Sequence, residues 1–190
     1  MSRHALLACT GVGLGTVGLA PRPVLAVCDP NFLPRVDLGL LESDAINEAS
    51  GLAASRRNAG VFWVHNDSGD RNRIFALNEL GEHLSVYTIA GARNRGWEDI
   101  ATGPGPDSGR TYIYIGEIGD NNAVYDTKYI YRVPEPRVDP DQAPIDTTLA
   151  GVETIAFHYP DGRRDAETLM VDIRSRSDRS SSWSTSTRSR

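Results

Sequence analysis

Two stretches of this chain, fifty positions apart, carry the same pattern of residues. GVFWVHNDSGD is followed by RIFAL, and RTYIYIGEIGDN is followed by YIYRV. In this register Asp67 matches Glu117, and Asp70 matches Asp120. Three tetrads also align with one another, at 50–53, 98–101 and 167–170. Self-similarity at a fixed spacing restricts the fold to one built from similar consecutive units.

Each copy contains short segments in which apolar and polar residues alternate, separated by clusters of Gly, Pro, Asn and Asp. This pattern predicts strands joined by turns, and no segment has the apolar spacing of a three-turn amphipathic helix. We therefore expect an all-β fold, and a repeat of this length made of short strands is typical of a β-propeller blade. The expected strands are 51–55, 61–66, 73–78 and 83–89 in the first blade, and 99–102, 111–117, 129–134 and 152–158 in the second.

The N-terminus is typical of a secretory signal. A short basic start precedes an uncharged apolar run at 5–20, and Val24-Leu25-Ala26 fits the residues that precede signal-peptidase cleavage. We expect a signal peptide at 1–26, export to a secreted or extracytoplasmic location in a bacterium, and no membrane span once the signal is removed. A net charge of -5 disfavours a nucleic-acid partner.

The C-terminus departs from the repeat. Residues 173–190 contain eight serines and five arginines with no strand period, a composition that predicts disorder. Because a propeller ring needs at least about four blades, we expect that the chain is truncated or frameshifted after about residue 171; a natural flexible basic tail is the alternative. The expected regions are 1–26, signal; 27–45, an N-terminal segment with a ring-closing strand at 36–41; 46–95, blade 1; 96–164, blade 2 with an insertion; 165–172, the start of blade 3; and 173–190, the tail.

Several motifs occur in a fixed order between residues 46 and 171. They are EASGLA, HNDSGD, WEDIA, GEIGDN, IYRVPEP and YPDGRRDAETL. Together they resemble a family of secreted bacterial β-propellers that is related to the phytase-like six-bladed propellers. The resemblance implies a six-bladed ring, monomeric in the full-length parent, with a channel lined by the starts of the inner strands. It also implies calcium binding and hydrolysis of a small phosphate or ester substrate.

Acidic residues recur where an inner strand begins and where the next strand ends. The candidate channel residues are Asp67, Glu98, Asp99, Glu117, Asp120 and Glu167, and the candidate calcium ligands are Asp67, Glu117, Asp120 and Asn121. In a propeller these positions gather at one mouth, where carboxylates raise one another's pKa unless a cation compensates. Calcium suits such a site because it takes six to eight oxygen ligands.

A structural role is the alternative for each of these residues. Asp and Asn beside Gly are the residues that a tight turn requires. Glu98 and Glu167 would then bind backbone amides of the neighbouring blade. Two functional classes follow, namely a calcium-dependent hydrolase of phosphates or esters and a non-catalytic scaffold or carbohydrate- or protein-binding module. The sequence assigns no individual catalytic residue.

Overall fold

The computed structural model describes residues 36–172 and the backbone of residues 183–187. The expected signal peptide at 1–26 lies outside these residues, as do 173–182 and 188–190 of the expected tail. All the strands belong to the unit formed by Leu38–Arg190. Within the described part of the chain there is no helix of the length and apolarity needed to cross a membrane.

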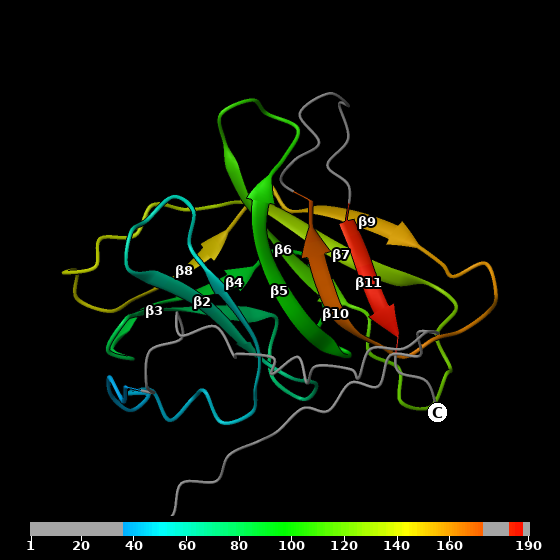
Figure 1. Cartoon of the computed structure of the whole chain (residues 1–190), viewed down its shortest axis with the longest axis horizontal. Helices are drawn as coiled ribbons and strands as arrows, with labels where there is room; N and C mark the ends of the chain where they lie inside the picture. Colours follow the sequence, from blue (N-terminus) through cyan, green and yellow to red (C-terminus); the bar gives the residue numbers. More distant parts are fainter. Residues whose placement is uncertain (1–35, 173–182, 188–190) are drawn as a thin grey trace, which may run out of the picture. The chain divides into compact units, whose positions relative to one another are not determined.

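The protein is all-β, as the alternating pattern predicts (Figure 1). One sheet has the order β1-β2-β3-β4-β8, with β1 at Ala49–Ala54, β2 at Val61–Asn66, β3 at Arg73–Asn78, β4 at His83–Ile89 and β8 at Ile145–Leu149. A second has the order β5-β6-β7-β9, with β5 at Trp97–Pro104, β6 at Thr111–Glu117, β7 at Lys128–Pro134 and β9 at Glu153–Phe157. A two-stranded sheet pairs β10, Ala166–Val171, with β11, Trp183–Thr187.

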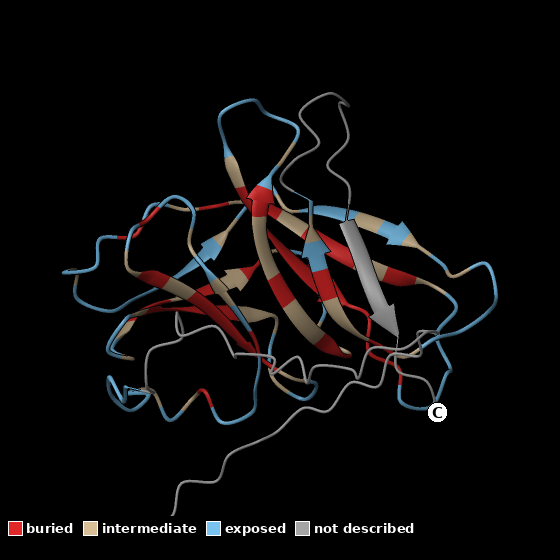
Figure 2. Cartoon of the chain, viewed as in Figure 1, coloured by how far each residue is buried: buried red, intermediate tan, exposed pale blue. Residues whose placement is uncertain are grey.

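Strands β1–β4 form an antiparallel meander, and β5, β6, β7 and β9 form another. The eight strands expected from the repeat are all present, with ends that differ by at most a few residues. Buried residues follow the middle strands of both sheets, whereas β8 and β9 at the edges are largely exposed (Figure 2). Each of the two larger sheets therefore contains a four-stranded antiparallel meander.

The core lies between these two sheets and on their outer faces. Because successive residues of a strand point to opposite faces, Trp63 of β2 and Ile113 and Ile115 of β6 all contribute to one cluster between the sheets. The alternate residues of β6 pack elsewhere: Tyr112 and Tyr114 contact Leu169 of β10 in a separate cluster. The middle strands are thus buried on both faces, which explains their nearly continuous apolar sequences.

Two expectations about the ends of the fold are wrong. Residues 36–41 form no strand, and their apolar side chains are exposed, with Leu40 at 90%. An alternating segment becomes a strand only where a sheet edge is available to pair with it. At the other end, the backbone of Trp183–Thr187 is a strand although we expected disorder. The open edge of β10 offers unpaired N–H and C=O groups, which a segment without apolar period can satisfy.

The insertion between β7 and β9 joins the two sheets. Strand β8, which the sequence pattern does not reveal, runs parallel to β4 and completes the first sheet. Just before it, the buried Glu135 Oε1 accepts hydrogen bonds from Ser55 Oγ at 2.6 Å and from Trp63 Nε1 at 2.8 Å. Val138 N donates to Asn58 Oδ1 at 3.0 Å. These contacts fix the position of the second sheet against the first.

A candidate acidic site at the starts of the inner strands

The starts of β1, β5 and β10 are linked to one another. Ser50 Oγ donates a hydrogen bond of 2.9 Å to the carbonyl oxygen of Glu98, and Leu169 N donates one of 2.8 Å to Asp99 Oδ2. The register of each strand with its neighbour shifts by one residue at this end, and the positions that the register skips are Ser50, Glu98 and Glu167. A β-bulge re-aims the extra side chain. The three repeats therefore present equivalent positions at one place.

Four carboxyl groups surround this place, and we call them the Glu98 cluster: Asp67, Glu98, Asp165 and Glu167. Burial is the largest cause that raises the pKa of Glu98 to about 8, and the negative charges of Asp67 and Glu167 raise it further. Asp165 adds a smaller repulsion, and Glu167 is hydrogen-bonded to the Glu98 side chain. At neutral pH Glu98 therefore holds a proton, because the charged form is disfavoured by both its burial and its neighbours.

Gly119 makes room for the Glu98 carboxyl group. A Cβ atom at this position would overlap Glu98 Oε1 and crowd the rest of the carboxyl group. The backbone of Gly119 is itself fixed, because its N–H donates to the carbonyl oxygen of Gly96 at 3.1 Å. Because Gly119 has no side chain, the β6–β7 turn can pass directly over Glu98.

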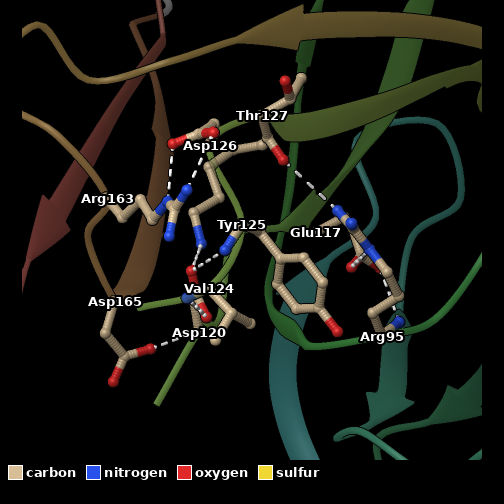
Figure 3. A network of polar contacts seen from close by, with 10 residues as sticks. Arg95, Glu117, Asp120, Val124, Tyr125, Asp126, Thr127, Arg163 and Asp165 are labelled. Carbon is tan, nitrogen blue, oxygen red and sulfur yellow. Dashed lines mark hydrogen bonds and ion pairs between the residues drawn. The ribbon is translucent and has the colours of Figure 1, made fainter. Parts of the chain in front are cut away.

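Glu117, expected as a channel or calcium residue, is instead bound to an arginine. Its side chain is only 1% exposed, Oε1 lies 2.9 Å from Arg95 Nε, and Oε2 accepts from Arg95 N at 2.9 Å. Arg95 also donates to the carbonyl oxygen of Thr127 at 3.4 Å (Figure 3). Both carboxylate oxygens of Glu117 are therefore engaged in holding the loop before β5 against β6.

Asp120 is engaged in the same way, by a lysine and two amides. Oδ2 lies 2.9 Å from the buried Lys128 Nζ and accepts from Tyr125 N at 2.8 Å, while Oδ1 accepts from Val124 N at 2.8 Å (Figure 3). Burial opposes ionisation of Asp120, but these donors outweigh it and lower its pKa. Asp120 N in turn donates to Asp165 Oδ1 at 2.7 Å, which connects this turn to the Glu98 cluster.

The remaining expected residues divide between the two roles. Asp99 binds backbone amides, those of Ile100 and Leu169, and so performs the stapling role that we expected for Glu98 and Glu167. Asp67 accepts from Ser68 N within its own turn and contributes its charge to the Glu98 cluster. Asn121 is exposed in the turn after Asp120. The structure thus brings Asp67, Glu98 and Glu167 together and assigns the other carboxylates to structural contacts.

The calcium ligands expected from the sequence do not fit a metal site. Glu117 and Asp120 have no carboxylate oxygen that is free of a protein donor. Across residues 36–172, no group of three or more His, Cys, Asp and Glu side chains is arranged so that it could hold a metal ion. The mechanism proposed below therefore does not use calcium at Asp67, Glu117, Asp120 and Asn121.

A pocket of about 210 Å³ opens beside Glu98. Its walls come from the loop before β5, the turn after β2 and the β6–β7 turn, and they include Ser68, Arg95, Gly119, Asn122 and Tyr125. The Arg95 guanidinium lies 4.2 Å from the centre of the Tyr125 ring, which closes one side. A small molecule in this pocket would meet the protonated carboxyl group of Glu98.

Three important residues are harder to find in the sequence. Lys128 is the only lysine of the chain, and its position eight residues after Asp120 is the only sign of the buried ion pair. Arg95 is one arginine of a loop that contains two. His65 is fully buried, with Nδ1 2.8 Å from Asn66 O and no partner for Nε2 within the described part of the chain; burial lowers its pKa although the Asn66 carbonyl and the Asp99 charge oppose this.

Comparisons with protein-family models, with curated proteins and with solved structures found no match to this chain.

Proposed function

We propose that this chain forms consecutive blades of an exported β-propeller that hydrolyses esters, with Glu98 and Glu167 as the catalytic carboxyl pair. The observation that carries the proposal is that Glu98, whose pKa is raised to about 8, is hydrogen-bonded to Glu167 and lines a pocket. Strongly perturbed carboxyl groups in pockets are frequent in active sites. The propeller part rests on the two equivalent meanders and on the third bulged strand, β10.

The pair can carry out the two proton transfers that hydrolysis requires. Glu167 accepts a proton from water as the water oxygen bonds to the acyl carbon of the ester. The protonated Glu98 donates its proton to the leaving oxygen as the bond between that oxygen and the acyl carbon breaks. Glu167 is then protonated and Glu98 ionised, and one proton transfer along their hydrogen bond restores the starting state. Two carboxyl groups in contact share one proton in this way because both cannot ionise.

The charge of the site favours an uncharged ester over a phosphate monoester. Asp67, Asp165 and Glu167 repel an anion. The charge of Arg95, the arginine that lines this pocket, is balanced by Glu117. A phosphate substrate would need an added cation to approach the pair, so calcium is included in the experiment as a variable.

The test measures hydrolysis of p-nitrophenyl acetate and p-nitrophenyl phosphate by the full chain, with calcium or with a chelator. We expect turnover of the acetate without calcium and a rate that falls as pH rises past about 8, where Glu98 loses its proton. Glu98→Gln and Glu167→Gln should each reduce the rate by about 10²-fold or more. Glu79→Gln, an exposed glutamate in the β3–β4 turn, is the control and should leave the rate unchanged.

Equal rates for all three variants would refute the catalytic role. Turnover of the phosphate alone, and only with calcium, would favour the metal-dependent alternative. If neither substrate is hydrolysed, the alternative function, a non-catalytic binding module, would be favoured.

A further inference from the structure

A second pocket of about 210 Å³, which does not include Glu98, lies between the β4–β5 connection and strands β7 and β9. It is lined by Gly91, Arg93, Arg95, Tyr129, Tyr131 and Thr154, and we call it the Arg93 pocket. Tyr129 and Tyr131 are alternate residues of β7 and so share one face of the sheet. Thr154 lies on the neighbouring strand β9, where it is paired with Tyr131. The lining contains no acidic side chain, although the chain as a whole is acidic.

Apart from Arg95, the polar side chains of this pocket are hydrogen-bond donors that have no acceptor among the described residues. The Arg93 guanidinium is exposed and has no hydrogen bond or ion pair to any residue in 36–172. Arg93 N donates to Tyr131 Oη at 3.2 Å, so this hydroxyl has an acceptor site filled and its own O–H left to donate. The hydroxyl groups of Tyr129 and Thr154 likewise have no partner in the described chain. Burial, the largest influence on the Tyr131 hydroxyl, raises its pKa and keeps it a donor.

Arg95 and Arg93 play different parts. Arg95 is neutralised by Glu117 at 2.9 Å, and its guanidinium lies 5.2 Å from the centre of the Tyr129 ring. It is therefore a fixed wall of the pocket. Arg93 is the uncompensated charge, and its guanidinium offers a planar pair of donors that matches a carboxylate or phosphate.

The tyrosine rings provide a flat apolar wall. Tyr129 and Tyr131 are stacked, with ring centroids 6.4 Å apart and planes inclined by 16°. Tyr131 is fixed from behind by Trp97, whose ring centroid lies 6.2 Å away. Rigid aromatic walls bind ring-shaped groups at little entropic cost because few torsions have to be fixed.

We propose that the Arg93 pocket binds a phosphate or carboxylate group carried on a ring, with Arg93 and the Tyr131 hydroxyl on the anion and the tyrosine rings beside the ring. This site is independent of the ester hydrolysis proposed for Glu98, because the two pockets have only Arg95 in common and Glu98 does not line this one. An anion is favoured here and repelled at the Glu98 cluster.

The test is a titration of the full chain with phenyl phosphate, followed by calorimetry or by chemical-shift changes. Inorganic phosphate tests the anion alone, and phenol tests the ring alone. We expect phenyl phosphate to bind at least about tenfold more tightly than either, since one charge-assisted pair is worth a factor of this size. Arg93→Gln should weaken binding by about tenfold or more, and Tyr131→Phe, which keeps the ring, should weaken it by a smaller factor.

The matched control is Arg71→Gln, which removes an exposed arginine from the β2–β3 turn. It leaves the Arg93 pocket intact and should not change binding. Phenyl phosphate binding that is unaffected by Arg93→Gln, or reduced equally by Arg71→Gln, would overturn the proposal. Equal affinity for phenol and phenyl phosphate would also overturn it, because the anion would then contribute nothing.

Discussion

The repulsion within the Glu98 cluster should make this protein less stable at high pH, and Glu98→Gln should remove the effect. Glutamine keeps the shape of a protonated glutamate and its ability to donate a hydrogen bond, but it cannot ionise. In wild type, the folded state binds more protons than the unfolded state between pH 4.5 and about 8. Stability therefore falls as pH rises through this range and reaches its lower limit above about 8.

The size of the effect follows from the pKa and the exposure. The difference between 4.5 and about 8, at about 1.36 kcal/mol for each pH unit, corresponds to roughly 5 kcal/mol for a fully buried group. Glu98 is only half-buried, and solvent screens the charges around it. We therefore expect Glu98→Gln to be more stable than wild type by about 1–2 kcal/mol above pH 8, and to differ little from it near pH 4.5.

Urea unfolding measures this difference directly. The tryptophans at positions 63 and 97 are buried and report unfolding by fluorescence. The free energy of unfolding of wild type and variant is compared at pH about 5 and about 9. Other groups titrate alike in both proteins, so their contributions cancel when the difference between the two proteins at one pH is compared with the difference at the other. Glu79→Gln, which removes an exposed carboxylate, should show no such change. A stability gain for Glu98→Gln that is absent at the higher pH, or equal at both, would refute the repulsion argument.

Three further outcomes follow from the structure. Lys128→Met should cost about 3–5 kcal/mol in urea unfolding because it leaves the buried Asp120 charge unpaired; a loss below about 1 kcal/mol would show that this ion pair is solvated. Gly119→Ala should displace the Glu98 carboxyl group, which would shift the alkaline limb of the pH–rate profile without a large loss of stability; an unchanged profile would contradict the close packing. The NMR signals of His65 should show a ring that titrates below pH 6.5, because burial lowers its pKa, and stability should fall as acid forces this ring to ionise; titration at 6.5 or above would contradict its burial.

The strands were predictable because their apolar residues alternate and their turns are marked. Val61–Asn66 and Thr111–Glu117 are examples in which one face packs between the sheets and the other packs outside. Ile145–Leu149 has no such signal, since all of it except Leu149 is exposed and it pairs with β4 through its backbone. Residues 36–41 show the reverse: they alternate in sequence but form no strand. Alternation predicts faces, whereas edges depend on the tertiary arrangement.

The repeat predicted that acidic residues gather, but it did not predict how they divide. Glu98 and Glu167 occupy equivalent bulges, so their approach follows from the repeat itself. Glu117 and Asp120 looked similar to them in sequence, yet Glu117 meets Arg95 from the loop before β5 and Asp120 meets Lys128 at the start of β7. Which carboxylate is paired depends on loop paths that a strand pattern does not encode. Glu98 and Glu167, which are hydrogen-bonded to each other, remain as the candidate site.

The position of β8 has a consequence for how the chain folds. In most repeat proteins each unit contacts its neighbours only through side chains, so units can form one after another. Here the first sheet receives its fifth strand only after β5, β6 and β7 have been synthesised, because β8 follows them in the chain and pairs with β4. Neither sheet is a complete folding unit, and a parallel pairing across such a separation forms late. We expect the two sheets to appear and disappear together in a single kinetic phase.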